Sequence, residues 1–277
     1  MRNKDCKVFL SPAEKTGFTA LLLALLLGWF NPVLAPLPLL FFLLLCLGMP
    51  FLPDVGFFLP LVSRGTRKTE GIALTFDDGP SPASTPILLD LLARHHLPAT
   101  FFVVGEKARR HPELIAAILA QGHTIGNHSW RHDYFLMLRT PKVLRADIRQ
   151  TQDILAKSGV TPLVFRPPVG ITGPRLGKAL ARENLIAVNY SCRAFDGGNR
   201  NIGNLAEKLL RRLQPGDIIM LHDLPPRQKS LSGYWQQELD RLFSALNENY
   251  QVAPLEEIIE YPVMRKSGKS PALGNGT

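Results

Sequence analysis

Two adjacent carboxylates, Asp77 and Asp78, stand at the end of an apolar run of strand length in this 277-residue chain. Two neighbouring negative charges are costly unless a cation or another partner neutralises them. If one carboxylate binds a metal ion, the other remains free to act as a general base. The sequence Asp-Gly-Pro is also favourable for a turn, so the pair alone leaves both interpretations open.

Two histidines, His128 and His132, offer further metal ligands. On a helix their spacing would place both imidazoles on one face, as a zinc-type ion requires. With Asp78 they form a two-histidine, one-carboxylate set that leaves a coordination position open for water and substrate. The set alone does not choose between zinc hydrolysis and iron oxygenase chemistry. His123, just upstream, is interpreted as structural.

Three more polar residues follow apolar runs. Two prolines after Arg166 stiffen its loop and fix the direction of the guanidinium, which can keep a neighbouring carboxylate ionised and oriented. His222 leaves a buried strand at a position suited to a general acid. The segment 191–198 contributes Asp196. A rigid surface loop at Arg166 and a core-edge histidine at 222 remain the alternative interpretations.

The elements that must position these residues alternate between strand-like and helical patterns. Strands are expected at residues 72–76, 99–104, 124–125, 163–165, 185–189 and 217–221. Helices are expected at residues 85–95, 112–121, 141–158, 174–183, 205–213 and 234–247. This alternation is typical of a parallel α/β sheet or barrel, which places its chemistry just after the strands.

The N-terminal part of the chain is apolar. We expect a basic tail at 1–16, one or two membrane segments at 17–62, a linker at 63–70, a catalytic domain at 71–262 and a flexible tail at 263–277. As a helix, 17–30 reaches only about 21 Å against a hydrocarbon core of about 30 Å, whereas 33–52 is long enough to span. A hairpin broken at Asn31-Pro32, a single span over 33–52 and a cleaved signal peptide are all open, although no clear cleavage site is present.

Charge and cysteines set further limits. The net charge of +9 is spread along the chain without a basic run, so a nucleic-acid partner is not expected. An anionic membrane surface or a phosphate-bearing substrate suits this charge equally well. The three cysteines imply no disulfide framework and leave the compartment open.

The motifs TFDDGP, HSxxH, RPP and LH, in this order and spacing, resemble the polysaccharide deacetylase family, also called the NodB-homology or carbohydrate esterase 4 family. The resemblance covers roughly residues 69–260. It implies a distorted (β/α) barrel of the NodB-homology type and metal-dependent removal of N-acetyl groups from an amino sugar of a polysaccharide or glycolipid. It gives no sign of an obligate protein partner.

The resemblance also implies a role for each residue that matches a motif. Asp77 corresponds to the catalytic base, and Arg166 to the residue that orients it. The implied ligands of one divalent ion are Asp78, His128 and His132. Zinc is expected because the donors are N, N and O, and cobalt, nickel or manganese could substitute.

The remaining roles lie on the other side of the implied site. His222 corresponds to the general acid and Asp196 to the carboxylate that holds it. Leu221 is similar to the residue that lines the acetyl-methyl pocket, and the backbone N–H near Val169 is similar to the oxyanion donor. The family usually has tyrosine where Val169 stands, and tryptophan where Gly197 follows Asp196, so a long chitin-like substrate is less strongly implied.

Alternatives remain for the activity and the location. A deacetylase or deformylase of a lipid-linked sugar at the inner membrane face would use the same machinery. A non-catalytic, membrane-tethered sugar-binding protein would be expected to lack a base or a ligand. We expect attachment to a bacterial-type cell membrane through the N-terminus. Both flanks of the apolar region are basic, which favours a hairpin and a cytoplasmic domain, whereas the family resemblance slightly favours the extracytoplasmic side.

Overall fold

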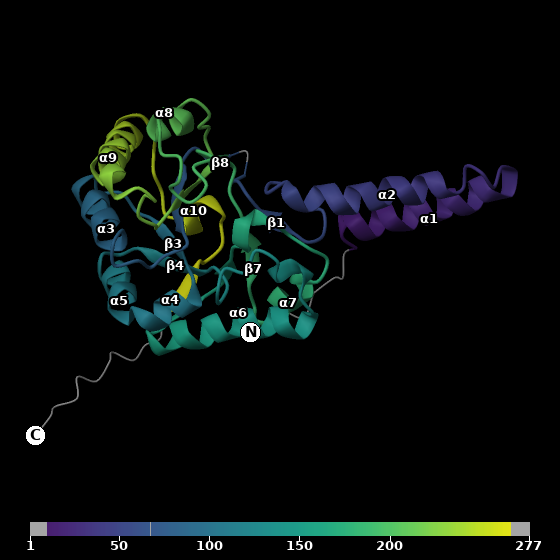
Figure 1. The fold of residues 1–277 in the computed structure, drawn as a ribbon, viewed down its shortest axis with the longest axis horizontal. Helices are drawn as coiled ribbons and strands as arrows, with labels where there is room; N and C mark the ends of the chain where they lie inside the picture. The colour runs from purple at the N-terminus through teal and green to yellow at the C-terminus, as the bar shows by residue number, and fades with distance from the viewer. Residues whose placement is uncertain (1–9, 67, 267–277) are drawn as a thin grey trace, which may run out of the picture.

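The computed structural model describes residues 10–66 and 68–266 (Figure 1). Its centre is a curled sheet with the strand order β1-β7-β6-β4-β3-β2-β9-β8, in which every pairing is parallel. The strands are β1 (Leu61–Val62), β2 (Ala73–Asp77), β3 (Thr100–Val103), β4 (Thr124–Asn127), β6 (Val164–Phe165), β7 (Ile186–Val188), β8 (Cys192–Arg193) and β9 (Ile218–His222). Within the described residues, β1 and β8 do not pair with each other, so the barrel is incompletely closed. The expected distorted (β/α) barrel is confirmed.

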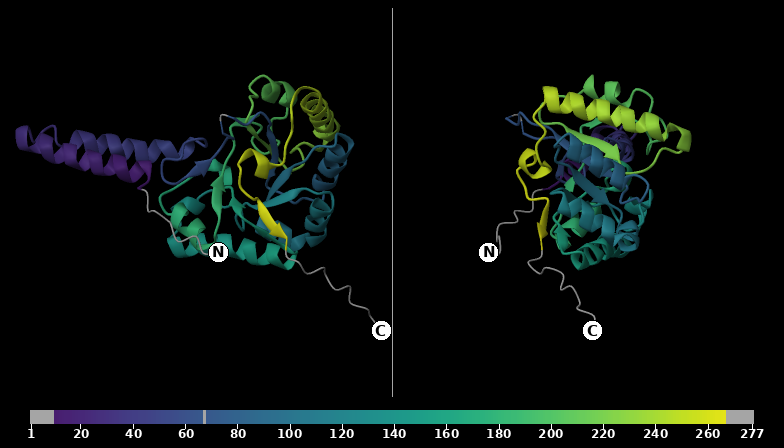
Figure 2. Two further views of the ribbon diagram at one scale, coloured as in Figure 1. Left: turned by 180° about the vertical axis from the view of Figure 1, so that it is seen from behind. Right: turned by 90° about the vertical axis from the view of Figure 1, so that its left-hand side faces the viewer.

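Helices surround the sheet (Figures 1 and 2). They are α3 (Thr85–Arg94), α4 (Gly105–Arg110), α5 (Pro112–Ala120), α6 (Pro141–Lys157), α7 (Leu176–Arg182), α8 (Leu205–Leu210), α9 (Ser232–Asn249) and α10 (Leu255–Ile258). Short 3-10 turns occur at Met49–Phe51, Leu136–Leu138, Pro168–Gly170 and Lys229–Leu231. The stacked rings of Phe76 and Phe101 and the edge of Phe243 from α9 fill the core behind β2. This core holds the end of β2, and with it Asp77, in a fixed position.

All of the strands and helices expected from the sequence are present, with ends that differ by a few residues. The elements that were not expected are short: β1, β5 (Val160–Pro162), β8, β10 (Met264–Lys266), α4 and α10. Two- and three-residue strands carry too little periodic pattern to be recognised in a sequence.

The boundaries of the catalytic domain need two corrections. At the C-terminal end, Val263 is fully buried and β10 pairs antiparallel with β5, so the domain continues beyond 262 into the expected tail. At the N-terminal end, Leu59 is buried and β1 pairs with β7. Residues 59–62, expected to belong to the membrane segment, are therefore part of the catalytic domain. The buried apolar residues of both segments, Leu59 and Val263, belong to the core of the barrel. Residues 1–9 and 267–277 of the two expected tails lie outside the described residues.

Two antiparallel helices, α1 (Pro12–Phe30) and α2 (Pro36–Gly48), lie side by side and project from the barrel (Figure 1). A turn at 31–35 separates them, so the single helix over 33–52 is not formed. A Cβ at Gly17 would lie 2.8 Å from Phe42 Cζ, so a larger residue at this position would require the Phe42 ring to move. Of the described residues, only α1 forms a helix long and apolar enough to cross a membrane, by length and composition.

The base of this hairpin is tied to the barrel. The Ala13 N–H donates to the Phe57 carbonyl at 2.9 Å, which brings the start of α1 to the chain that leaves α2. Asn189 Nδ2 donates to the carbonyls of Pro53 and Gly170 at 2.8 and 3.0 Å. The chain that enters the barrel therefore rests against the loop after β6.

Candidate active site

A pocket of about 310 Å³ opens where polar residues follow β2, β4, β8 and β9. Of the site residues predicted from the sequence, those that line it are Asp77, Asp78, His128, His132, Val169, Asp196 and His222. Parallel pairing places Asp77 of β2 directly beside His222 of β9. The structure thus brings together residues that are up to 145 positions apart in the chain, 77 to 222.

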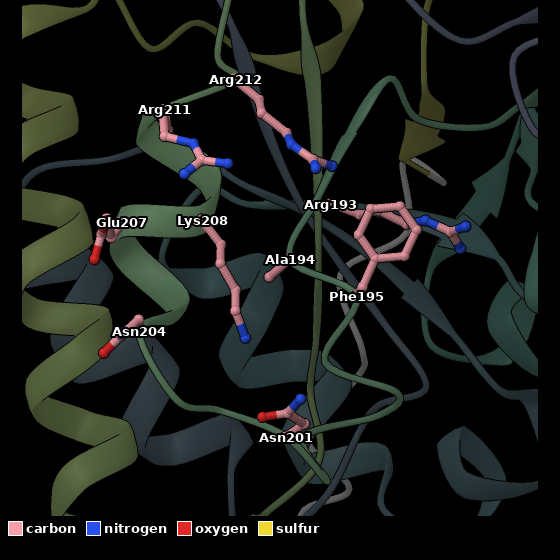
Figure 3. A pocket seen from close by; sticks show the side chains of 9 residues that line it. All are labelled: Arg193, Ala194, Phe195, Asn201, Asn204, Glu207, Lys208, Arg211 and Arg212. Carbon is pink, nitrogen blue, oxygen red and sulfur yellow. The ribbon is translucent and has the colours of Figure 1, made fainter.

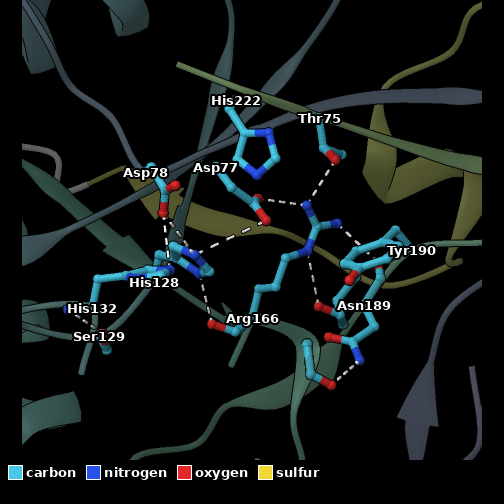
Figure 4. Close-up of polar contacts among 12 residues, drawn as sticks. Thr75, Asp77, Asp78, His128, Ser129, His132, Arg166, Asn189, Tyr190 and His222 are labelled. Carbon is cyan, nitrogen blue, oxygen red and sulfur yellow. Dashed lines mark hydrogen bonds and ion pairs between the residues drawn. The ribbon is translucent and has the colours of Figure 1, made fainter. Parts of the chain in front are cut away.

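Arg166 lies behind the pocket, fully buried, and fixes Asp77 (Figure 4). Its Nη1 donates to Asp77 Oδ1 at 2.7 Å and to Thr75 Oγ1 at 2.8 Å. Its Nε and Nη2 donate to the carbonyls of Val188 and Asn189 at 3.2 and 2.8 Å. A permanently charged guanidinium, anchored by four hydrogen bonds, holds the Asp77 carboxylate in one orientation.

Asp78 and the two histidines form a compact donor group. His132 Nε2 lies 3.0 Å and His128 Nε2 lies 3.4 Å from Asp78 Oδ1 (Figure 4). His128 Nδ1 is 2.8 Å from the Arg166 carbonyl, which can only accept. The proton of a neutral His128 therefore sits on Nδ1, and Nε2 is left with a free lone pair, as a metal ligand requires.

The two histidines do not lie on a helix, which corrects the helical interpretation of their spacing. They occupy the loop after β4, in which Ser129 and His132 adopt the left-handed conformation with φ of 67° and 56°. Ser129 Oγ accepts from the His132 N–H at 3.0 Å, and Asn127 Oδ1 accepts from the Ser129 N–H at 2.9 Å. The turn brings the imidazole rings to a centroid distance of 5.0 Å.

This donor group suits a cation. One ligand atom from each of Asp78, His128 and His132 lies within 4.8 Å of the others. The Asp78 Oδ1 atom is buried, and no hydrogen-bond donor of the described residues satisfies it. Burial raises the pKa of Asp78, but the neighbouring His128 and His132 outweigh burial, so the pKa lies well below its ordinary value. An ionised, unsatisfied oxygen between two imidazole nitrogens fits a divalent ion.

His222 and Asp196 form a second wall of the pocket, next to Asp77. His222 Nδ1 lies 2.7 Å from Asp196 Oδ2, which also accepts from the Asn199 N–H at 2.9 Å. Burial lowers the pKa of His222, but the hydrogen bond and charge of Asp196 more than compensate, and the net pKa is raised. The neighbouring Asp223 accepts instead from Ser84 Oγ and Thr85 Oγ1, both at 2.6 Å.

Leu221 does not line the pocket, which corrects the expectation for the acetyl-methyl site. Leu221 and Ile219 face the outer core between the sheet and the helices. Side chains alternate along a strand, so Met220 shares the pocket face with His222, and Leu224 joins it from the following loop. The same alternation, counted back from His222, would have identified Met220 from the sequence.

The pocket rim contains aromatic residues that the motifs do not include. Tyr134, Tyr190 and Phe195 line it, and the side chains of Tyr134 and Phe195 are well exposed. They supply aromatic faces although the family's tryptophan is replaced by Gly197. Val169 also lines the rim with φ 54°, an unusual conformation for a β-branched residue.

Comparison with known proteins matches residues 64–187 to the family described as polysaccharide deacetylase. The chain is 34% identical over 198 residues to a chitooligosaccharide deacetylase of Sinorhizobium fredii, covering 69% of this chain and 92% of that protein. The chain belongs to the polysaccharide deacetylase family. The predicted resemblance is confirmed.

Two more members of the family are similar over the barrel. A peptidoglycan-N-acetylglucosamine deacetylase of Listeria monocytogenes is 32% identical over 192 residues, 69% of this chain but only 39% of that longer protein. The crystal structure of a peptidoglycan N-acetylglucosamine deacetylase in complex with an N-hydroxybenzamide has a TM-score of 0.67 and 28% identity, covering 74% of this chain and 95% of the other. The similarity thus concerns the barrel.

Proposed function

We propose that this protein is a metal-dependent N-deacetylase of an acetylated amino sugar. The observation that carries the proposal is the pair of pocket walls that meet where β2 and β9 end. Asp77, oriented by buried Arg166, lies beside His222, held by Asp196, in a pocket that also contains the three-ligand group. Hydrolysis of an amide requires a base for water and an acid for the amine, and the two walls supply them.

Asp77 acts as the general base. Its Oδ1 is occupied by Arg166, whereas its Oδ2 faces the ligand group, 4.0 Å from His128 Nε2. A water between Asp77 and the sugar amide would lose its proton to Oδ2 while it attacks the carbonyl carbon. The fixed guanidinium prevents Asp77 from turning away, so little reorganisation is needed as the bond forms.

His222 acts as the general acid. The protonated imidazole donates to the amide nitrogen as the C–N bond breaks, so that an amine rather than an amine anion leaves. The N–H of Val169 donates to the oxyanion of the tetrahedral intermediate. Met220 and Leu224 line the site of the acetyl methyl. The products are acetate and a free amino sugar.

Asp78, His128 and His132 would hold one divalent ion, for which zinc is the expected choice. Such an ion polarises the amide carbonyl and lowers the pKa of a water molecule. Tyr134 and Phe195 offer aromatic faces on which sugar rings can stack. Together these groups favour an N-acetylated sugar over a peptide or a small free amide.

The test is a panel of acylated sugars with the purified full-length protein, in which released acetate and formate are measured separately. We expect acetate from N-acetylated sugars, with about one metal ion per chain, and loss of both metal and turnover in His128→Ala. Formate release from N-formyl sugars alone would make the protein a deformylase. Full turnover after exhaustive chelation would overturn the proposal.

We also propose that the α1–α2 hairpin inserts into the membrane and leaves the barrel on the cytoplasmic face. Large apolar side chains of the hairpin, such as Leu25, Trp29 and Phe30, are strongly exposed, which is costly in water and favourable in lipid. The start of α1 is bonded to Phe57, so both ends of the hairpin lie on one side. The basic residues of both flanks then satisfy the positive-inside rule together.

A reporter fused after Thr277 tests this orientation. A cytoplasmic reporter should be active there, and one that works only outside the cytoplasm should be silent. The opposite result would contradict the hairpin topology.

A further inference from the structure

A second pocket, of about 420 Å³, lies next to the catalytic pocket. Four basic residues line it: Arg193 and, from α8 and the segment after it, Lys208, Arg211 and Arg212 (Figure 3). Among the described residues that line it, Glu207 alone is acidic. We call these four basic residues the basic cluster.

In the described part of the chain, the charges of the basic cluster are not neutralised by ion pairs. Among the described residues, none of its four members forms an ion pair. Elsewhere in the barrel, arginines such as Arg64, Arg139 and Arg145 are paired with carboxylates. Four like charges around one concave surface repel one another unless an anion lies between them. Their arrangement therefore suits a negatively charged ligand.

An aromatic ring holds part of the cluster in place. The guanidinium of Arg193 lies 4.2 Å and that of Arg212 lies 5.6 Å from the centre of the Phe195 ring. Arg193 Nη1 also donates to the Tyr190 hydroxyl at 3.1 Å. Stacking orients the flat faces of the guanidinium groups and leaves most of their N–H donors available for a ligand.

The two pockets share a wall. Arg193 and Phe195 line both of them, and Asp196, which holds the general acid His222, is the next residue in the chain. Arg200 adds another cation to the lining of the catalytic pocket. A ligand that reaches from the catalytic pocket across Phe195 therefore enters the basic cluster.

We infer that the substrate carries a phosphate or diphosphate group, which the basic cluster binds while its N-acetylated sugar occupies the catalytic pocket. This inference rests on the proposed function and names its substrate class. Guanidinium groups match phosphate oxygens in paired hydrogen bonds, and a diphosphate has enough charge for several cations. A neutral polysaccharide would leave the cluster without a partner. The chemistry is shared by a nucleotide-linked sugar and a lipid-diphosphate-linked sugar.

The test uses full-length protein in lipid nanodiscs and matched substrates. Methyl N-acetylglucosaminide is the neutral sugar, N-acetylglucosamine 1-phosphate adds the phosphate, and a uridine-diphosphate-linked and a polyprenyl-diphosphate-linked N-acetylglucosamine provide the two sources. The variant is Arg211→Gln with Arg212→Gln, because both side chains are exposed. The matched control is Lys142→Gln with Arg182→Gln, which removes the same charge from a separate basic surface beside α6 and α7.

We expect wild type to prefer the phosphate-bearing sugars in kcat/KM. The variant should lose about 10- to 100-fold on them, because a hydrogen bond to a charged group typically contributes such a factor. On the neutral sugar it should change by less than about twofold, since neither arginine lines the catalytic pocket. The control should retain the preference. Whichever of the lipid-linked and the nucleotide-linked sugar has the higher turnover identifies the group that carries the diphosphate in the natural substrate.

Three results would overturn the inference. The first is an equal kcat/KM of wild type for neutral and phosphate-bearing sugars. The second is an equal loss of kcat/KM on the phosphate-bearing sugars in the variant and in the control. The third is a variant that no longer binds phosphatidylglycerol vesicles but keeps the preference for phosphate-bearing sugars. The last result would assign the cluster to the membrane surface. In each case acetate release from the neutral sugar still supports the proposed function. If metal-loaded protein releases acetate from no sugar at all, the proposed function itself fails.

Discussion

The two walls of the catalytic pocket are built differently. Asp77 is held from behind by Arg166, which is fully buried and bonded to groups of β2 and β7 and to Asn189 after β7. His222 sits at a strand end and is held by Asp196 through one hydrogen bond, beside the exposed Phe195. An arginine keeps its charge at every accessible pH, whereas a histidine gains or loses its charge near neutrality.

The Asp77 wall, here called the base wall, is therefore rigid, whereas the His222 wall, the acid wall, titrates. The base wall depends on a permanent ion pair inside the protein, so its failure should affect folding and catalysis together. The acid wall depends on a proton, so its failure should affect catalysis and its pH dependence but not folding.

The largest effect is expected from Arg166→Gln, which leaves Asp77 as a buried carboxylate without its cation. Removing one partner of a buried pair typically destabilises a protein by about 3–5 kcal/mol, and turnover should be lost as well. Urea unfolding and acetate release measure the two effects. The matched control is Arg145→Gln, whose pair with Glu183 is partly exposed and should contribute about 1 kcal/mol or less. Equal destabilisation by the two variants would contradict the rigid base wall.

His222→Ala should lower kcat on an N-acetyl sugar by about 10²- to 10⁴-fold, the usual contribution of general acid–base catalysis. Its unfolding free energy and metal content should stay near wild type. An O-acetyl sugar should show a smaller loss, because an alkoxide leaves more easily than an amine anion. If the loss were the same for ester and amide, His222 would not be the proton donor to the leaving group.

Asp196→Asn tests the titration of the acid wall. Burial alone would lower the pKa of His222, and the hydrogen bond and charge of Asp196 raise it above its ordinary value. The active form is protonated, so activity falls as pH rises through this raised pKa. Without the carboxylate the pKa falls, and the alkaline limb of the kcat–pH profile should move to lower pH. An unchanged limb would assign control of His222 to another group.

The smallest effect is expected from Val169→Gly. Glycine adopts a φ of 54° without the steric cost that valine has there. The backbone N–H remains, so kcat should stay within about threefold if that N–H is what binds the oxyanion. A loss of the size seen for His222→Ala would show that the valine side chain itself takes part.

The sequence was sufficient for the parts of the molecule that have long or repeated patterns. The apolar runs of β2 and β9 predicted strands, and the four motifs selected the residues that follow them. Parallel strands end at one edge of a sheet, so Asp77 and His222 could be expected to meet. The hairpin turns at Asn31-Pro32, as the sequence indicated. Proline is tolerated in the first turn of a helix but interrupts the interior of one.

Other features were beyond the sequence for physical reasons. The left-handed residues Ser129 and His132 turn the histidine loop, and a four-residue spacing is equally consistent with a helix. In the basic cluster, Arg193 lies near Arg211 and Arg212 because the chain folds back along α8. No local pattern in the sequence reveals this proximity. The motif led to Leu221 as the residue lining the acetyl-methyl site, whereas the alternation of side chains along β9 places Met220 in the pocket.

The central claim is that Asp77 is a base rather than a ligand. It is tested most directly by measuring acetate release and bound metal together in wild type and Asp77→Asn. We expect the variant to remain folded with its metal bound, although its free energy of unfolding falls because buried Arg166 loses its counter-charge. On an N-acetylated sugar its kcat should fall by about 10²- to 10⁴-fold. Near-normal acetate release by Asp77→Asn, or loss of metal in step with activity, would contradict the account.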